Sequence, residues 1–447
     1  MLPPCPAPLW SDGVVSVPRR LLHESVVADV AIVGAGYSGL WSAYWLTERD
    51  PHLDVVVLER HHVGFGASGR NGGWVSALLP APLQSFARAI GDAKTRALQT
   101  EMFRAVREIG EIAEREGIDC HYHRGGTISL VANESQRQRA KNDADDYRRF
   151  GFENHVEMLH RSFTRARVAV DTEAVFRPDC AVVHPRRLVD GLAASVESRG
   201  VRIFEGTAVT AVRPGEIATE RGRVRARYVI DCREAYAAPA SRRRIVPIYS
   251  LMIATEPLDD ETWRTIGLPD RETLTDHRRQ LVYAQRTRDG RLAFGGRGVG
   301  YRLGSRIDAG FERNARVHDD LRSSMIELFP SLADARVTHQ WGGPLAAPRD
   351  WMWTVDLDPG SRTGVTGGYV GDGVTSAFVA GRVMADAIVR GETDFPLFGH
   401  RSPRWEHEPI RWLGINTLSR LAGALDRRES QGRSTGLLGR TYDRLLG

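Results

Sequence analysis

Lysine is nearly absent from this chain of 447 residues, in which all but two of the 61 Lys and Arg residues are arginine. The two lysines are Lys94 and Lys141. The arginines are scattered among 56 acidic residues, so the net charge of +5 is not gathered into the basic stripe of a nucleic-acid surface. We therefore expect no nucleic-acid partner.

Cysteine is scarce as well. The cysteines are Cys5, Cys120, Cys180 and Cys232. Their wide spacing contains no C-x-x-C pair, which argues against a disulfide framework, an iron–sulfur cluster and a zinc site. We expect no bound metal.

Long apolar runs are missing too, since no stretch approaches the roughly 18 apolar residues that span a bilayer. Residues 1–27 lack the uninterrupted apolar core of a signal peptide and are expected to form an irregular arm. A hydrophobic share of 42% is typical of a globular protein. These features predict a cytoplasmic protein without a membrane partner, and the length predicts two domains.

A phosphate-binding pattern stands near the N-terminus. Residues 28–33 (ADVAIV) predict a buried strand, and Gly34, Gly36 and Gly39 follow it as G-x-G-x-x-G before a helical pattern. A second apolar strand, DVVVLE, ends at Glu59, whose carboxylate suits the two hydroxyls of a ribose. Strand, glycines, helix and terminal acid together predict a Rossmann-type dinucleotide site. By themselves they leave NAD and FAD open.

Two further glycine clusters point to the same ligand. Residues 64–74, GFGASGRNGGW, hold five glycines, so their backbone is expected to pass close to a ligand, with Arg70 and Asn71 as the large polar groups. In GGYVGDGV, at 367–374, a strand turns into a helix whose first N–H groups are free to bind a carbonyl or anion. A third cluster, GGRGVGYRLG at 295–304, has neither helix nor terminal acid after it and is expected to be a hairpin turn.

The remaining patterns predict a second, mixed sheet. Apolar periodicity predicts helices over 83–116, over 186–199 and near 311–328. Strands are expected at 246–256, 280–286 and 291–296. Near the C-terminus, Ile415, Leu418, Leu421 and Leu425 predict a helix that docks on the body.

Several of these motifs resemble one family when read in order: DVAIVGAGYSGLWSAYWL, VVVLER, GFGASGRNGG, VVHPRRLVDGLA, WGGPLAAPRDW and GGYVGDGV. They are similar to the FAD-dependent oxidoreductases of the D-amino-acid-oxidase-like family, nearest the branch of γ-glutamylputrescine oxidase, glycine oxidase and sarcosine oxidase. The resemblance covers roughly residues 25–391. It implies FAD contacts from Gly34, Gly36, Tyr37, Ser38, Gly39, Glu59, Arg60, Ala67, Ser68, Arg70, Asn71, Gly72, Gly73, Val209, Gly371, Gly373 and Val374.

The resemblance also implies an α/β fold, in which a Rossmann-like FAD-binding domain carries an inserted, mixed-sheet substrate domain of α+β type. The FAD-binding domain is expected to be discontinuous, over residues 28–80, 184–245 and 345–391. Residues 81–183 and 246–344 are expected to form the substrate domain, and 392–447 a partly helical C-terminal extension.

The chemistry that the family implies is transfer of a hydride equivalent from a carbon bearing an amine to flavin N5, after which the imine hydrolyses. Tyr249, Trp341 and Asp372 are candidates for the catalytic site on this basis. The alternatives, which the pattern favours, are that Tyr249 and Trp341 are packing aromatics and that Asp372 caps the helix that follows it. The substrate is expected to be a small amine or amino acid.

Two departures from the family bear on the reaction. Glycine-oxidase-like relatives hold the substrate carboxylate with an arginine where this chain has Pro344 and Leu345, which favours an amine over a simple α-amino acid. Sarcosine-oxidase-like relatives place a lysine near the flavin to activate oxygen, and neither lysine of this chain falls in the comparable stretch. Oxygen and another electron acceptor therefore both remain open.

Two other functions stay open as well. A flavin monooxygenase is suggested by the GDG at 371–373, although the continuation of that motif is lacking. A protein that keeps FAD as a structural element and binds a partner is suggested by the C-terminal extension. Because residues 64–74 contain no His or Cys, the FAD is expected to be bound non-covalently.

Overall fold

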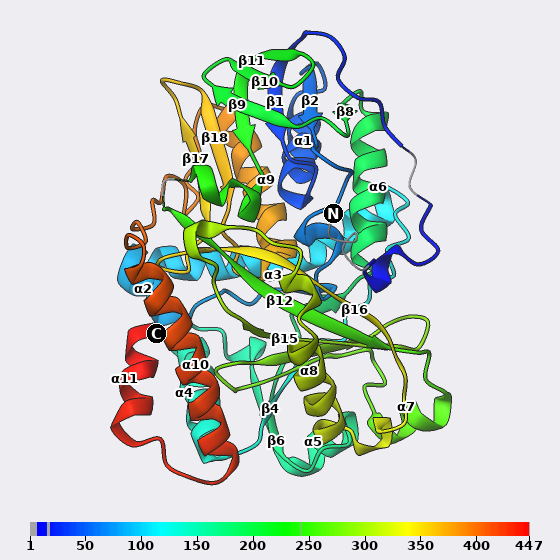
Figure 1. Ribbon diagram of the computed structural model, residues 1–447, viewed down its shortest axis with the longest axis vertical. Coiled ribbons are helices and arrows are strands. Elements are labelled where there is room, and N and C mark those ends of the chain that lie inside the picture. The colour runs from blue at the N-terminus through cyan, green and yellow to red at the C-terminus, as the bar shows by residue number, and fades with distance from the viewer. Residues whose placement is uncertain (1–6, 16–17, 242, 447) are drawn as a thin grey trace.

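The computed structural model describes residues 7–15, 18–241 and 243–446. Two large sheets organise these residues, one in the upper half of Figure 1 and one in the lower half. A two-stranded ladder of β3 (Trp74–Ser76) and β7 (Cys180–Val182) accompanies them.

The upper sheet has a parallel core. Its strands lie in the order β17 (Thr354–Asp358), β18 (Thr363–Gly367), β11 (Arg223–Asp231), β1 (Val26–Val33), β2 (Val55–Leu58) and β8 (Arg202–Phe204), with β9 (Val209–Arg213) and β10 (Glu216–Thr219) attached to β11. The pairs from β18 to β8 are parallel, whereas β17 is antiparallel to β18. In the central β1, Val30 and Ile32 are fully buried, as expected for a strand covered on both faces.

The helices α1 (Tyr37–Arg49) and α9 (Gly373–Val389) pack on one another against this sheet, next to α6 (Pro185–Ser198) (Figure 1). Gly381 allows their close approach, since a Cβ at this position would lie 2.7 Å from backbone atoms of α1. The N-termini of α1 and α9 both follow strands of the same sheet, so their free N–H groups converge on one region.

The lower sheet is mostly antiparallel, with β13 and β4 as a parallel pair. Its strands lie in the order β16 (Val337–Pro348), β12 (Ile245–Thr255), β15 (Leu292–Val299), β14 (Val282–Arg286), β13 (Thr273–Asp276), β4 (Thr127–Val131), β6 (Glu173–Arg177) and β5 (Glu157–Leu159). The helices of this region are α2 (Leu83–Ile90), α3 (Asp92–Arg115), α4 (Glu134–Arg149), α5 (Arg161–Arg167), α7 (Asp260–Ile266) and α8 (Ala315–Leu328).

Two local expectations from the sequence are wrong. The helix predicted over 83–116 is two helices, because Gly91 takes a φ of +86° between α2 and α3. The hairpin turn predicted at 295–304 is in part a strand, because β15 runs on to Val299. The glycine there has another use: a Cβ on Gly295 would lie 2.5 Å from the ring of Tyr283, which rests against this backbone.

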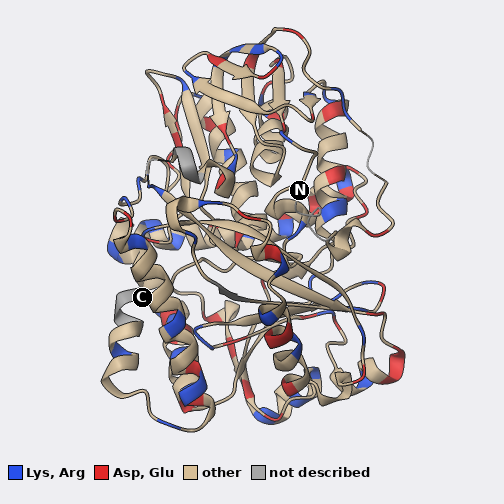
Figure 2. Ribbon diagram, in the orientation of Figure 1, with Lys and Arg blue, Asp and Glu red and all other residues tan. Residues whose placement is uncertain are grey.

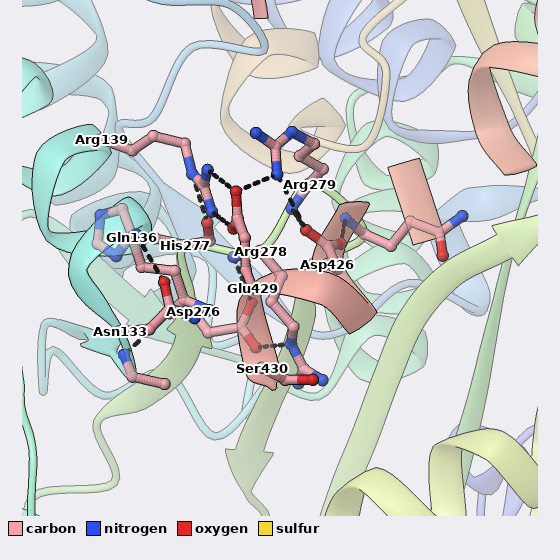
Figure 3. Close-up of polar contacts among 12 residues, drawn as sticks. Asn133, Gln136, Arg139, Asp276, His277, Arg278, Arg279, Asp426, Glu429 and Ser430 are labelled. Carbon is pink, nitrogen blue, oxygen red and sulfur yellow. Dashed lines mark hydrogen bonds and ion pairs between the residues drawn. The ribbon is translucent and has the colours of Figure 1, made fainter. Parts of the chain in front are cut away.

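The C-terminal extension forms α10 (Ile410–Ser430) and α11 (Gly436–Leu446), which run beside α4 in Figure 1. It docks on the turn between β13 and β14 through an ion cluster of Arg139, Arg279, Asp426 and Glu429 (Figure 3). The side chain of Glu429 is only 1% exposed, and it binds Arg279 at 2.7 Å and Arg139 at 2.8 Å. The predicted docking helix is therefore present, and buried charge as well as leucine holds it.

Figure 2 shows basic and acidic residues interspersed along the helices, among them α6, α8 and α10. Within the described ranges, no helix combines the length and apolarity needed to cross a membrane.

Candidate functional site

The first glycine motif closes tightly between β1 and α1. Gly34 has a φ of +108°, and a Cβ there would lie 2.9 Å from the carbonyl oxygen of Cys232. A Cβ on Gly39 would lie 2.0 Å from the carbonyl oxygen of Gly34, so the first turn of α1 could not pack on the loop with any larger residue. The result is a helix N-terminus presented at the edge of a parallel sheet, where anionic ligands bind.

Glu59 stands at the end of β2 beside this turn. Its carboxylate accepts hydrogen bonds from the backbone N–H of Ala35 at 3.0 Å and of His61 at 2.9 Å. Burial raises its pKa, while these two bonds act in the opposite direction. Each oxygen keeps a further lone pair, so the carboxylate can still accept from ribose hydroxyls.

The loop over 64–74 crosses in front of α1 and is folded on itself. The Asn71 side chain donates to the carbonyls of Ala67 and Ser68 at 3.1 and 3.0 Å and accepts from the Gly73 N–H at 2.8 Å. Ser68 Oγ accepts from the Tyr37 N–H at 2.8 Å, which ties the loop to the first turn of α1. The loop backbone is thereby held at a fixed distance from the helix N-terminus.

Arg70, which was expected to be a polar group facing the ligand, is paired inside the protein instead. Its guanidinium forms an ion pair with Glu312 at 2.8 Å, and the two side chains are 9% and 5% exposed. It also lies over the ring of Phe65, 4.6 Å from the centroid. Glu312 therefore offsets much of the positive charge that Arg70 would otherwise present to a ligand.

A cavity of about 190 Å³ follows these elements. The predicted cofactor residues that line it are Gly34, Gly36, Tyr37, Ser38, Glu59, Arg60, Ala67, Ser68, Asn71, Val209, Gly371, Gly373 and Val374. Gly39 and Gly73 instead serve packing, since a Cβ on Gly73 would lie 2.0 Å from Gln285 Nε2. The structure thus brings together three glycine clusters that are far apart in the sequence.

A second cavity, of about 410 Å³, adjoins the first. The two share Ala67, Asn71, Leu345, Gly371 and Val374, and Arg70 and Gly72 line the second cavity alone. Its wall carries the apolar side chains of Trp74, Leu78, Leu79, Met252, Leu281 and Leu345, with Ser250 and Tyr283 hydrogen-bonded to one another at 2.7 Å. A bound dinucleotide in the first cavity would therefore border a space suited to a substrate.

The three catalytic candidates occupy different places. Asp372 lines the larger cavity at the N-cap position of α9, but its side chain makes no capping hydrogen bond within the described residues. Tyr249 packs on the opposite face of the sheet against Phe311, and its hydroxyl accepts from the Asp308 N–H at 2.9 Å. Trp341 lies beneath the glycine loop and donates from Nε1 to the Arg70 carbonyl at 2.8 Å. The side chains of Tyr249 and Trp341 therefore contact neighbouring elements and do not line either of the two cavities.

Sequence reasoning missed the segment after β11. Glu234 lines the smaller cavity and accepts from the backbone N–H groups of Ala346, Gly368 and Tyr369 at 2.8 to 3.2 Å. Burial raises its pKa to about 7, against the effect of these bonds. No motif marks this segment, although it follows β11, a parallel neighbour of β1, and ligands bind at the carboxyl ends of such strands.

Tyr283 was missed as well, and its strand carries no motif that marks it. Its ring lies between Gly72 and Gly295, where a Cβ on either would come within 3 Å of it. No group of three or more His, Cys, Asp or Glu side chains that could hold a metal ion occurs among the described residues.

The fold and the two joined cavities define a dinucleotide-binding oxidoreductase. The sequence profile described as FAD dependent oxidoreductase matches residues 29–387, so the chain belongs to that family and FAD is its cofactor. The chain is 31% identical over 395 residues to the gamma-glutamylputrescine oxidoreductase of Escherichia coli (strain K12), covering 84% of this chain and 87% of that protein.

Two solved structures share the fold. One is the L-proline dehydrogenase of P. horikoshii, with a TM-score of 0.68, 18% identity, and coverage of 85% of this chain and 96% of that one. The other is the glycine oxidase of Geobacillus kaustophilus, with a TM-score of 0.68, 22% identity, and coverage of 84% and 99%.

The residues present fit FAD. The cradle around Gly34, Gly36 and Gly39 admits backbone and diphosphate but no added Cβ, and the first residues of α1 line the cavity where the negative charge of the diphosphate would lie. Leu345 and Gly371, which line both cavities, mark where the smaller cavity passes into the larger one.

Proposed function

We propose that the chain oxidises a carbon–nitrogen bond of an amine, giving an imine that water hydrolyses to a carbonyl compound and ammonia, or a smaller amine where the donor is N-substituted. The observation that carries the proposal is the continuity of the two cavities through five shared residues. Bound FAD supplies the acceptor of the hydride equivalent. The similarity to a gamma-glutamylputrescine oxidoreductase supports an amine as the donor.

The protein's part in such a reaction is to orient the C–H bond and to favour the neutral amine. Asp143, Asp276 and Asp372 line the larger cavity, where Asp143 is paired with Arg177 and Asp276 with Arg278. Apolar side chains of the wall, such as Met252 and Leu345, disfavour the charged form, so the amine gives up its proton as it is desolvated. No strong base is then required, because the lone pair of the neutral amine assists departure of the hydride.

The paired hydroxyls of Tyr283 and Ser250 are the polar groups best placed to orient the substrate. They bond one another at 2.7 Å, and Ser250 also donates to the Gly296 carbonyl at 3.1 Å. Packing between Gly72 and Gly295 keeps the Tyr283 ring in one position. Tyr283→Phe should therefore slow substrate oxidation while FAD content stays at the wild-type level.

The proposal is tested by mixing the purified protein anaerobically with a panel of amines, N-methylated amines and amino acids. Bleaching of the flavin absorption by an amine supports the proposal, and the imine is identified by trapping the carbonyl product. A flavin monooxygenase would instead require NADPH for bleaching. If no member of the panel reduces the flavin, the non-catalytic, partner-binding function gains support and the proposal fails.

Reoxidation of the reduced enzyme by oxygen and by an artificial dye distinguishes an oxidase from a dehydrogenase. Lys94 and Lys141 lie on α3 and α4 and do not line the larger cavity described here. Because a fixed cation near the flavin favours electron transfer to oxygen, we expect the dye to be the faster acceptor.

A further inference from the structure

We propose that a third cavity, which lies beside the glycine loop of residues 64–74, binds a small oxyanion such as phosphate or a carboxylate. Arg271 would form the ion pair with the anion, and His121 and His184 would donate neutral N–H groups to it. The cavity has a volume of about 160 Å³ and shares no lining residue with the two cavities described above. The inference therefore does not depend on the proposed function.

The wall of this cavity is assembled from five separate segments. Trp10 comes from the N-terminal arm, His121 from the loop after α3, and Arg187 from the first turn of α6. Arg271 stands just before β13, and Arg288 lies in the turn between β14 and β15. Three arginines from three segments thus converge on one space. Because a cavity needs only about 10–15 Å³ to hold a water molecule, this one admits an anion of several heavy atoms.

The acidic side chains of the wall do not neutralise these arginines. Asp12 lines the cavity but contacts His339 at 3.2 Å, and Asp289 lines it but pairs with Arg291 at 2.9 Å. Both side chains are more than half exposed, at 54% and 61%, so water screens what remains of their charge. The cavity therefore keeps an excess of positive charge.

Arg271 is the arginine left without a carboxylate. Asp119 contacts the other two, Arg187 at 3.8 Å and Arg288 at 3.4 Å. Within the described ranges, no Asp or Glu lies at ion-pair distance from Arg271, and the charged groups that act on it are arginines. A half-buried cation in positive surroundings is the group that an added anion would stabilise most.

The hydrogen bonds of Arg271 point to the same conclusion. Its Nε donates to the Arg286 carbonyl at 3.3 Å, and its Nη1 to the His121 carbonyl at 3.4 Å, both of which are long. Burial and the charges of Arg288 and Arg286 lower its pKa. Nη2 has no hydrogen-bond partner in the described part of the chain, yet it is not among the fully buried atoms that lack one. It is therefore open to a ligand in the cavity.

The two histidines add donors without adding charge. His184 Nδ1 accepts from the backbone N–H of Arg187 at 3.2 Å, so the proton of the neutral ring sits on Nε2. Burial, with the charges of His121 and Arg187, lowers the pKa of His184 to about 4, and burial and Arg187 lower that of His121. The ring centroids are 5.6 Å apart. Neither His184 Nε2 nor the His121 ring bonds another described residue, so each can donate to an oxyanion.

The wall is also joined to the glycine loop. Trp10 donates from Nε1 to the Asn71 carbonyl at 2.8 Å, and Gln285 donates from Nε2 to the Gly72 carbonyl at 2.7 Å. Both donors line the third cavity, and their side chains are buried. Asn71 in turn lines the cavity assigned to FAD. An anion that fixes this wall would steady the loop, so we expect it to tighten the binding of FAD.

The test uses the FAD-bound protein in a chloride buffer without oxyanions. Sodium phosphate and, separately, sodium acetate are titrated into it in a calorimeter at constant ionic strength, which keeps the screening of surface charge constant. We expect one saturable site per chain for phosphate and weaker binding of acetate, which carries less charge and fewer acceptor oxygens. Tighter binding of acetate would assign the site to a carboxylate. If neither anion binds at millimolar concentration, the proposal is refuted.

Variants locate the site. Arg271→Met should weaken phosphate binding at least about 10-fold, because a charge-assisted hydrogen bond is lost. Arg271→Lys should recover part of the affinity, since it keeps the charge but not the planar fork. The matched control Arg165→Met removes a 62% exposed arginine that pairs with Asp171 and should bind phosphate as the wild type does. Equal affinity in all these proteins would mean that phosphate binds the arginine-rich surface in general, which contradicts the proposal.

A second measurement needs no variant. Phenylglyoxal modifies accessible arginines of the wild-type protein, and mass spectrometry of peptides gives the rate at each one. Phosphate should slow the modification of Arg271 and leave that of Arg165 unchanged. If phosphate does not protect Arg271, the assignment is wrong, whether or not Arg271→Met folds.

The link to the glycine loop has its own readout. Free FAD in equilibrium with diluted protein is measured after ultrafiltration, with and without phosphate. Phosphate should tighten FAD binding at least about 5-fold in the wild type and in Arg165→Met, but not in Arg271→Met. Weaker FAD binding would place the anion in the FAD cavity and overturn the proposal. An unchanged affinity for FAD, with phosphate bound, would leave the oxyanion site in place and refute its link to the loop.

Discussion

Replacing Glu429 with alanine should loosen both the C-terminal extension and the substrate cavity. Glu429 is the acidic centre of the cluster in Figure 3, bonded to Arg279 at 2.7 Å and to Arg139 at 2.8 Å. Without it, Arg279 stays 5% exposed and keeps Asp426, 3.6 Å away, as an ion-pair partner. The substitution therefore leaves a buried charge poorly compensated.

The magnitude follows from that burial. Breaking a buried ion pair from one side typically costs 3–5 kcal/mol, and the 24% exposure of Arg139 lets water recover part of this. We expect a loss of about 2–3 kcal/mol in the free energy of unfolding. Asp171→Ala, which breaks an exposed pair with Arg165 at 2.6 Å, should cost about 0–1 kcal/mol.

The assay combines urea unfolding with limited proteolysis of α10, because the loss can appear as local release of the extension. The turn after Asp276 should shift with it, so substrate binding weakens while the limiting rate of flavin bleaching is retained. If Glu429→Ala matches Asp171→Ala in unfolding midpoint and in protease resistance, the ion cluster does not hold the extension and the reasoning is refuted.

The same cluster predicts a dependence on pH. Burial raises the pKa of Glu429, but hydrogen bonds and charge from Arg139 and Arg279 outweigh it, and the net pKa is lowered. A carboxylate whose pKa is lower in the folded state stabilises the fold above its unfolded pKa, and the contribution is lost as the pH falls through the folded pKa. Wild-type protein should therefore lose stability on acidification more steeply than Glu429→Gln, and parallel curves for the two proteins would contradict this.

Three further predictions concern the cofactor and the cavity. Gly36→Val should lower the FAD content of purified protein, because a Cβ there already lies 2.9 Å from Ser68 Oγ; the control Gly414→Ala, which meets nothing within 4 Å, should retain FAD. Acid precipitation should release FAD into the supernatant, and a yellow pellet would refute non-covalent binding. Gly295→Ala should displace the Tyr283 ring and raise the substrate dissociation constant, whereas an unchanged constant would mean that this ring does not contact the substrate.

The dinucleotide half of the site could be predicted because its rules are local. Gly34, Gly36 and Gly39 are required by a turn and a helix start within six residues, and Glu59 follows at the end of the next parallel strand. Backbone conformation and the alternation of strand and helix are enough to bring these groups to one edge. The family resemblance then supplied the identity of the nucleotide, which the motif alone left open.

The tertiary structure decided the substrate half. Arg177, Tyr283 and Leu345 come from three strands of one sheet, and no spacing in the sequence brings them together. Trp341 is the opposite case. It was a candidate for the catalytic site, but its register on β16 puts it beneath the glycine loop, bonded to the Arg70 carbonyl. Local sequence could not distinguish a cavity wall from a packing contact.

What the sequence determined by itself was therefore the cofactor cradle, where glycine is required by steric contacts between near neighbours in the chain. Only the folded chain decided which charged groups pair and which side chains form the cavity wall when they come from distant parts of the sequence. Arg70, in the middle of the glycine loop, pairs with Glu312, 242 residues away, and Arg177 faces the cavity because β6 pairs with β4. Those pairings depend on which surfaces the whole molecule buries together.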